Sequence, residues 1–330
     1  MMRRRKFIKI TALTSAGVSI PITHLQTMAS PEAILKPAAM ITNNDDFYVL
    51  QKGIQPKLKK DRWRLGIMGL VKEKKFFNYE ELSSLDSVTT MRTLQCIGDP
   101  IGTEQMSNAM WTGVPLQTCL KEAGVKSSAK LVVFRCADGY HTAIPIADAM
   151  HEKTLLAYKM NGVVLPHEHG FPIRLLNPGH YGTKNPKWIV TIELSEKHEG
   201  YWEKRGWDPV ASVKLAAMIG TPAKGSVVKP GTIYTISGAA FDSSNHGGIK
   251  NIEVSVDAGR TWKTAEIWGN DSPLAWTLWK YIWHVPDEVG TVEILARATA
   301  NDGLIQKETG FDANPAGAVS YHSISVQIAE

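Results

Sequence analysis

Residues 167–189 read HEHGFPIRLLNPGHYGTKNPKWI, a stretch with glycine, proline and basic side chains that packing alone does not require. Arg174 follows His169 by five positions, and Lys187 comes thirteen positions later. Glycine lets a backbone approach a ligand closely. A planar guanidinium and a compact ammonium together suit a phosphate group. The stretch therefore predicts a phosphate-binding loop; the alternatives are a solvated surface loop, or a zinc or copper site at His167 and His169.

Strand and helix patterns are mixed in the part of the chain around this loop. Residues 111–125 predict a turn and a helix that ends at Gly124, and residues 130–146 predict two strands around an Asp-Gly turn. A second hairpin is expected at 155–165 and a further strand at 187–194. Strands and helices do not alternate regularly, which favours an α+β fold over a doubly wound sheet. Neither dinucleotide-binding motif nor P-loop occurs, so a nucleotide cofactor has no support.

The pattern changes near Ala216, where short strand-like segments begin to alternate with turn residues. Ile252, Val254 and Val256 alternate with polar residues, as in a strand with one buried face. Repeated short strands of this kind indicate a β-sandwich. Aromatic side chains dominate cores and subunit contacts, so we expect this role for Trp276, Trp279 and Trp283, with a ligand-stacking surface as the alternative. The domain prediction is a signal peptide at 1–30, a linker at 31–44, a first domain at 45–215 and a sandwich at 216–330.

The net charge of +5 belongs to the N-terminus. The chain has 37 basic and 32 acidic residues, and residues 1–30 contain five basic residues and no acid. The remainder is neutral, which argues against nucleic-acid binding. A weakly apolar stretch near residues 10–22 is too short to span a bilayer. Because RRKFIK at 4–9 resembles a twin-arginine export signal, we expect a periplasmic protein; an ordinary secretory signal or an uncleaved anchor is the alternative.

The three cysteines are Cys96, Cys119 and Cys136, and an odd number leaves at least one thiol unpaired. Cys119 falls in the predicted helix and is expected in the core. Cys96 lies in TLQCIGDPIG, where a predicted strand over 87–95 ends just before a turn. On its own the residue is a buried small hydrophobe, or else a ligand or nucleophile held at a rigid strand end.

Several ordered motifs resemble the sulfite oxidase family of molybdopterin enzymes. They include TLQC at 93–96, ADGYHTAIPI at 137–146, HGFPIRLLNPG at 169–179, YGTKNPKWI at 181–189 and GYWEKRGW at 200–207. In the last third, VSVDAGRTW and SYHSISVQI are similar to the family's immunoglobulin-like dimerisation domain. The resemblance covers about residues 42–330. It implies a mixed α/β molybdopterin domain followed by an immunoglobulin-like β-sandwich.

The resemblance also implies a cofactor and the residues that hold it. The cofactor would be molybdenum with one molybdopterin, and Cys96 would ligate the metal, since thiolates are good ligands for redox metals. The pterin and its phosphate would be held by Tyr48, Lys52, Asp138, His169, Arg174, Asn185, Pro186 and Lys187. The expected reaction is oxygen-atom transfer, most simply sulfite oxidation. Electrons would go to an external carrier such as a c-type cytochrome or a membrane subunit, and the sandwich would form a homodimer.

The sequence departs from the family around the expected substrate site. Leu50 stands where an arginine is usual, and Gly98-Asp99-Pro100-Ile101 replaces a G-N-R-R pattern. An anionic substrate would lose charge-assisted hydrogen bonds, each worth about 1.5–3 kcal/mol. His198 stands near the place of the family's catalytic tyrosine, with Tyr201 three positions later, so both are candidate catalytic residues. The alternatives are therefore a reductase of sulfoxides or N-oxides, or a binding protein without catalysis.

Overall fold

The computed structural model describes residues 40–102, 105–242, 246–268, 272–308 and 315–330. Residues 35–330 form one compact unit. The predicted signal peptide and residues 31–39 of the predicted linker lie outside the described residues, and the predicted domain limits stay predictions. In the described part of the chain, we find no helix with the length and apolar character that crossing a membrane requires.

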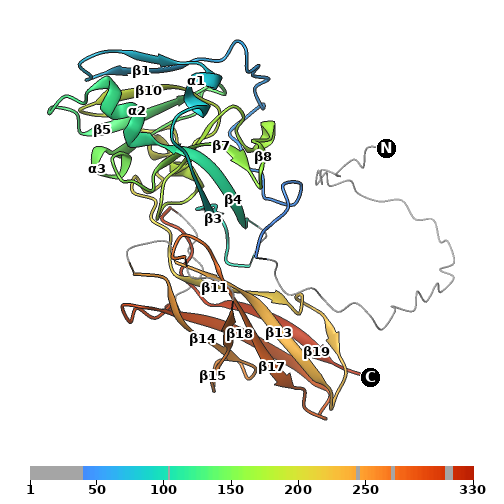
Figure 1. The fold of residues 1–330 in the computed structure, drawn as a ribbon. Coiled ribbons are helices and arrows are strands. Elements are labelled where there is room, and N and C mark those ends of the chain that lie inside the picture. Colours follow the sequence, from blue (N-terminus) through green and yellow to red (C-terminus); the bar gives the residue numbers. More distant parts are fainter. Residues whose placement is uncertain (1–39, 103–104, 243–245, 269–271, 309–314) are drawn as a thin grey trace, which may run out of the picture. The chain divides into compact units, whose positions relative to one another are not determined.

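Two sheets build the first half of the fold (Figure 1). One has the order β2-β1-β10-β5-β6 and comprises β1 (Leu65–Gly69), β2 (Lys75–Phe77), β5 (Leu131–Cys136), β6 (His141–Pro145) and β10 (Ile189–Ser195). The other has the order β3-β4-β7-β8, with β9 also paired to β7, and comprises β3 (Val88–Gln95), β4 (Met106–Pro115), β7 (Leu155–Met160), β8 (Val163–Val164) and β9 (Arg174–Leu176). All pairs are antiparallel except β1 with β10. This topology excludes a doubly wound sheet.

The helices of this half are short. They are α1 (Tyr79–Ser83), α2 (Leu116–Ala123), α3 (Ile146–Ala149) and the 3-10 turns η1 (His167–His169), η2 (Gly182–Lys184) and η3 (Glu203–Arg205). Asn78 starts α1 with a capping box, because its side chain accepts from the Glu81 N–H while the Glu81 carboxylate accepts from the Asn78 N–H. Gly124, at φ +68°, ends α2 as predicted. The α+β prediction is confirmed, with strands contributing more than helices.

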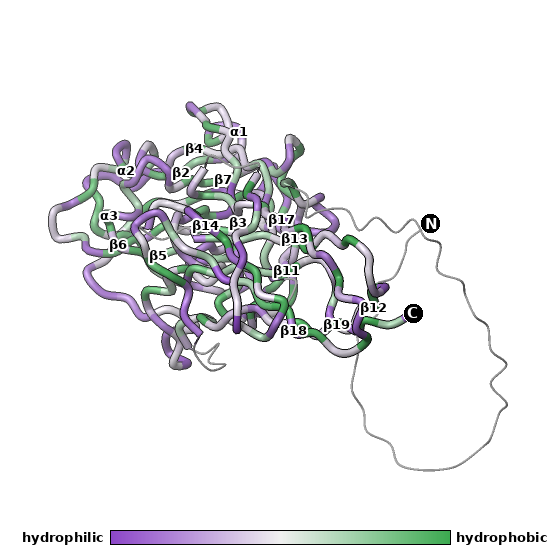
Figure 2. The backbone as a smooth tube through the Cα atoms, turned by 90° about the horizontal axis from the view of Figure 1, so that it is seen from below, coloured by the Kyte–Doolittle hydropathy of each residue, from purple (hydrophilic) through white to green (hydrophobic). Residues whose placement is uncertain are grey.

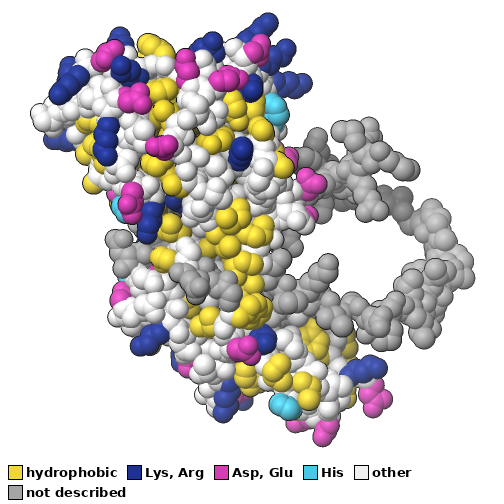
Figure 3. Space-filling view, in the orientation of Figure 1, with side chains coloured by type: hydrophobic (Ala, Val, Ile, Leu, Met, Phe, Trp, Pro, Cys, Tyr) yellow, Lys and Arg dark blue, Asp and Glu magenta, His cyan; other side chains and the backbone are white. Residues whose placement is uncertain are grey.

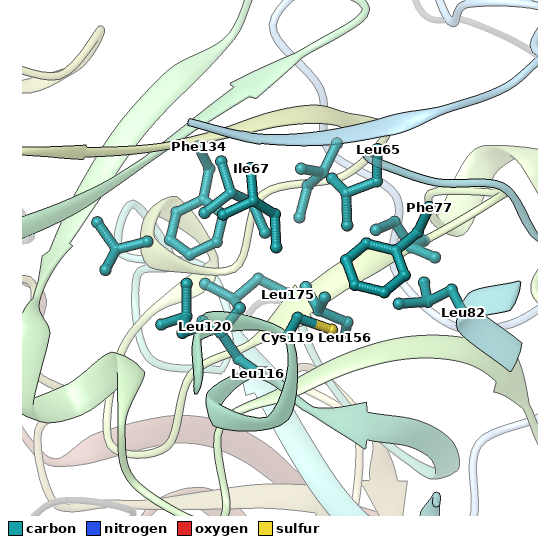
Figure 4. Close-up of a cluster of buried hydrophobic side chains, with 14 of the residues drawn as sticks. Leu65, Ile67, Phe77, Leu82, Leu116, Cys119, Leu120, Phe134, Leu156 and Leu175 are labelled. Carbon is teal, nitrogen blue, oxygen red and sulfur yellow. The ribbon is translucent and has the colours of Figure 1, made fainter. Parts of the chain in front are cut away.

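A continuous core lies between these elements. Leu65 and Ile67 of β1 are fully buried, since alternate strand residues face the same side. Figure 4 shows them with Phe134 of β5, beside Leu116 and Cys119 of α2 and Leu156 and Leu175 of the other sheet. Cys119 is therefore a core residue, as expected. The core holds both sheets rigidly, and their strand ends carry the candidate site.

The last third is a β-sandwich of two sheets. The first, β11-β13-β17-β16, comprises β11 (Ala216–Thr221), β13 (Ile233–Phe241), β16 (Glu266–Trp268) and β17 (Thr277–His284). The second, β12-β19-β18-β14-β15, comprises β12 (Val227–Val228), β14 (Ile249–Ser255), β15 (Lys263–Thr264), β18 (Gly290–Ala300) and β19 (His322–Ile328). Residues of β19 alternate strictly between buried and exposed. Hydrophobic and hydrophilic stretches follow one another along the chain in Figure 2. The sandwich prediction is confirmed.

The tryptophans of the sandwich have two roles. Trp279 and Trp283 fill its core with Ile252 and Val254, as expected. Trp276 instead packs in a cluster with Ile97, the neighbour of Cys96. The backbone N–H of Trp276 donates to Thr93 Oγ1 at 2.7 Å. The sandwich thus supports the strand end on which Cys96 lies.

Charged side chains of both signs are mixed on the surface. In Figure 3, basic and acidic groups lie among each other over the visible face, without a region of one sign alone. This agrees with the neutral balance of the chain after residue 30.

Candidate functional site

One cavity of about 340 Å³ collects residues from five separate stretches of the chain. All nine residues predicted to hold the cofactor line it: Tyr48, Lys52, Cys96, Asp138, His169, Arg174, Asn185, Pro186 and Lys187. Two catalytic candidates, His198 and Tyr201, do not. The structure therefore brings the predicted cofactor residues together, while their individual roles stay predictions.

Cys96 comes directly after β3, and its backbone fixes the position of the thiol. Its N–H donates to the Gln105 carbonyl at 3.0 Å, and its Sγ accepts from the Gly98 N–H at 3.4 Å. Gly98 has little space for a side chain, because an added Cβ would lie 3.3 Å from the Trp207 ring. Burial raises the pKa of the Cys96 thiol, and the carboxylate of Asp99 raises it further. A metal ion would reverse this, because a coordinating thiol is deprotonated outright.

Arg174 is the deepest cation of the cavity. It begins β9 and is 5% exposed, and its guanidinium carbon lies 5.2 Å from the centre of the Trp111 ring. Its Nη1 donates to the His169 carbonyl and its Nη2 to the Asn185 carbonyl, both at 3.2 Å. Its buried Nε has no partner among the described residues. Burial lowers the pKa of Arg174 to about 10, so the guanidinium stays charged at neutral pH.

Lys187 lies beside Arg174 because the two form an isolated β-bridge. Its Nζ donates to the Glu168 carbonyl at 2.8 Å and lies 4.3 Å from the centre of the Trp188 ring. Burial, together with the charge of Arg174, lowers the pKa of Lys187 to about 7. A bound phosphate would reverse that shift and give Arg174 Nε an acceptor. The donors present therefore fit a phosphorylated ligand.

Gly170 lets the backbone approach these cations closely, and Gly182 lets it approach Tyr48. Gly170 has φ +119°, and a Cβ there would lie 3.1 Å from the side chains of Arg174 and Lys187. A Cβ on Gly182 would lie 3.3 Å from the Tyr48 hydroxyl. The positive φ favours glycine at position 170, whereas a side chain at position 182 would require the Tyr48 hydroxyl to shift.

His169 is 1% exposed and neutral, since burial lowers its pKa to about 4. Its Nε2 lies 2.8 Å from the Asn44 carbonyl and therefore carries the proton. That hydrogen bond connects the loop to the segment that contains Tyr48. His169 is thus an orienting neutral group here, and a zinc or copper site with His167 would compete with this bond.

Lys52 lies at the rim of the cavity. Its Nζ donates to the Asp138 carbonyl at 3.2 Å and lies 4.9 Å from the centre of the Tyr201 ring. Arg205 lies on the same ring at 3.8 Å. Tyr201 therefore supports the rim through Lys52 without lining the cavity itself.

His198 is absent from the cavity lining and contacts β6. Its Nε2 lies 3.1 Å from Nδ1 of His141, and both rings are partly buried. Burial lowers the pKa of His198, and the neighbouring His141 lowers it further. This pairing gives His198 a partner on the sheet, so its catalytic role has no contact with the cavity to support it.

Sequence reasoning missed several residues that line the cavity: Ile97, Gln105, Tyr140, Thr183, Trp188, Trp202 and Trp207. Trp202 and Trp207 lie 5.8 Å apart between ring centres and form an apolar wall. The Tyr140 hydroxyl donates to the Thr183 carbonyl at 2.7 Å. The motif GYWEKRGW could have identified both tryptophans. Two large aromatic residues next to glycines in a loop do not belong to the buried face of a strand or helix, which suggests another role for them.

A buried ion pair fixes the loops around the cavity. Lys184 in η2 pairs with Glu203 in η3, and its Nζ also donates to Thr142 Oγ1 at 3.2 Å and to the Ala143 carbonyl at 3.1 Å. The side chains of Lys184 and Glu203 are 5% and 12% exposed. The pair connects the loop of Asn185 and Lys187 to the loop of Trp202 and Trp207.

Two family models match the chain. The oxidoreductase molybdopterin binding domain matches residues 52–202, and the Mo-co oxidoreductase dimerisation domain matches residues 208–328. The chain belongs to the sulfite oxidase family of molybdopterin oxidoreductases. The predicted family is confirmed.

Individual relatives agree with this assignment. Mitochondrial sulfite oxidase of Rattus norvegicus is 28% identical over 350 aligned positions, which cover 91% of the chain and 64% of the relative. The chain therefore spans just under two thirds of that protein. A putative protein-methionine-sulfoxide reductase subunit, YedZ1 of Azospira oryzae, is 36% identical over 149 positions, 44% of the chain and 54% of the relative. The sulfane dehydrogenase SoxCD of Paracoccus pantotrophus has the same fold, with a TM-score of 0.76 and 23% identity over 88% of this chain and 84% of that one.

Proposed function

We propose that this protein is a molybdenum-cofactor oxidoreductase that oxidises a small sulfur oxyanion, with sulfite as the first substrate to test. One observation carries the proposal: the Cys96 thiol and the cations of Arg174 and Lys187 open into the same cavity. When bound, the molybdenum cofactor supplies oxygen-atom transfer with a two-electron change.

The residues divide into a cofactor end and an entrance. Cys96 would ligate the metal, because a soft thiolate suits a redox-active transition metal. Arg174 and Lys187 would hold the pterin phosphate, and the carbonyl-bound guanidinium would keep its position without a side-chain partner. Leu50 at the rim and the wall of Trp202 and Trp207 would exclude water from the entrance.

Partners and location form part of the proposal. The match to a dimerisation domain supports a homodimer through residues 208–328. The RRKFIK motif supports export to the periplasm by the twin-arginine route. Electrons would leave one at a time to an external carrier, such as a c-type cytochrome or a membrane subunit.

The test is an anaerobic sulfite titration of the exported protein, with molybdenum measured in the same sample. We expect the thiolate-to-metal absorption to disappear at about one sulfite per metal. Cys96→Ala should lose this absorption and the activity, whereas the control Cys119→Ala should keep both, because Cys119 lies in the core. Full metal-dependent activity in Cys96→Ala would show that the ligand assignment is wrong.

A second candidate function is the reduction of a neutral sulfoxide or N-oxide. The observation that favours it is the apolar entrance, where Leu50 is 47% exposed and, of the described residues, Arg174 is the one arginine in the lining. Full metal content without any response to sulfite would support this reaction. A correctly exported protein that contains no molybdenum would instead support the binding-protein alternative.

Leu50→Arg separates the two candidates. If sulfite binds at the entrance, the new guanidinium should lower its KM about tenfold or more, from about 1.5–3 kcal/mol per charge-assisted bond. The control Leu50→Met keeps the size without the charge. An unchanged sulfite KM in Leu50→Arg would mean that the anion does not pass this position.

A further inference from the structure

A second, smaller hollow lies between β3 and the segment after β9. Arg92 and Leu94 line it from β3, and Asn177 and His180 line it from that segment. Its volume is about 10 Å³, which is room for a single guest about the size of a water molecule.

The polar atoms around this hollow have unused hydrogen-bonding capacity. Arg92 and Asn177 are each 4% exposed. Arg92 Nε and both polar atoms of the Asn177 side chain have no partner among the described residues. Among the described residues, the Arg92 side chain makes one hydrogen bond, a long one of 3.4 Å from Nη1 to the Leu176 carbonyl. Two buried side chains therefore present donors to one small space.

The charge of the hollow is not balanced by its own walls. Arg92 is charged at neutral pH, since burial lowers its pKa only to about 10. Of the described residues in the lining, none is an aspartate or glutamate. Buried charges in proteins are normally paired. A water molecule would accept from the donors and donate to Asn177 Oδ1 but leave the charge unbalanced, whereas a small anion would accept from the donors and balance the charge.

We propose that this hollow binds a monovalent anion of halide size between Arg92 and Asn177. Arg92 Nε and Asn177 Nδ2 donate to it, with the amide oriented so that its oxygen points away. Oxyanions with several heavy atoms exceed the volume. The anion is structural and lies outside the cavity that Cys96 lines.

The proposed site connects directly to the cofactor end of the main cavity. Asn185 lines both hollows. Its Oδ1 accepts from the Asn177 N–H at 2.7 Å, and its carbonyl accepts from Arg174. Arg92 also bonds Leu176, two residues from Arg174 on β9. An anion that holds Arg92 and Asn177 therefore holds the backbone on which Arg174 depends.

Bromide is the probe for the site. Crystals of the cofactor-loaded protein grown in sodium bromide should show an anomalous peak in contact with Arg92 Nε. The melting temperature of the same protein should rise with chloride concentration at fixed ionic strength, because a ligand that binds the native state stabilises it. Gluconate, which is too large for the hollow, serves as the reference anion. No peak and equal melting temperatures in chloride and gluconate would overturn the proposal and leave a water site.

Asn177→Asp gives an independent test, because it places a permanent carboxylate beside Arg92. The variant should lose the chloride response and melt, without chloride, near the temperature of the chloride-saturated parent. Asn251→Asp adds the same charge on β14 of the sandwich and should keep the response. A full chloride response in Asn177→Asp would overturn the proposal. If that variant does not fold, the bromide map of the parent protein still decides.

Discussion

Replacing Glu203 by glutamine should destabilise the protein through Lys184. The ammonium of Lys184 is buried, and its neighbours other than Glu203 are the neutral oxygens of Thr142 and Ala143. Glutamine keeps the size of Glu203 and an oxygen that can accept a hydrogen bond. The substitution therefore removes the compensating charge and little else.

The magnitude follows from the burial of the pair. Removing one partner of a buried ion pair costs about 3–5 kcal/mol. Glu203 Oε2 has no hydrogen-bond partner among the described residues, so the native pair is itself incompletely satisfied and the lower end applies. At about 2–4 °C for each kcal/mol in a domain of this size, a loss of about 3 kcal/mol lowers the melting temperature by roughly 6–12 °C.

Calorimetry of the cofactor-loaded protein measures this shift. Adding Lys184→Met to Glu203→Gln should recover most of it, because the unpaired charge is then gone. The control is Glu266→Gln, which breaks a pair with Lys280 whose side chains are 64% and 39% exposed. Exposed pairs contribute at most about 1 kcal/mol. If Glu203→Gln lowers the melting temperature by only about 2–4 °C, no more than the control Glu266→Gln does, the reasoning is refuted.

Two further predictions concern Lys187 and Gly102. The pKa of Lys187 is about 7 in the folded protein and near 10.4 when unfolded, so the unfolded state binds more protons between these values. The free energy of unfolding of the cofactor-free protein should therefore rise with pH from about 7 to 10.4, and urea titrations should show that Lys187→Met removes this rise; a flat profile in the parent would contradict it. Gly102 has φ +94°, and a Cβ there would overlap the imidazole of His322. Gly102→Ala should thus lower the melting temperature more than Gly303→Ala, where φ is +93° but no atom lies within 4 Å, and equal losses would mean that the loop moves freely.

Regular patterns allowed much of the fold to be predicted. The alternation at Ile252 and Val254 and the glycine after α2 are local signals, and both appear in the structure as expected. Helix content was harder to predict. α1 comprises only Tyr79–Ser83, and a helix this short depends on tertiary packing more than on its own propensity.

Some residues of the candidate site could likewise be predicted from the sequence, and others could not. Motifs predicted the residues that share the cavity, since Cys96, Arg174 and Lys187 lie within distinctive segments. Motifs could not predict the contacts of the His198 side chain, because its partner His141 is 57 positions away in the sequence. Lys184 could not be recognised either, because lysine is almost never fully buried unless it is paired, and its partner lies in another loop.

The deep cations of the main cavity and the residues at its entrance come from different segments of the chain. The deep cations and their supporting carbonyls come from one uninterrupted stretch, residues 168–188, whereas Leu50, Trp202 and Trp207 come from elsewhere. Substitutions at Leu50, Trp202 or Trp207 therefore leave the stretch that carries Arg174 and Lys187 unchanged. If the entrance selects the substrate, as proposed, a few codon changes there are enough to alter specificity while the stretch that carries Arg174 and Lys187 is inherited unchanged.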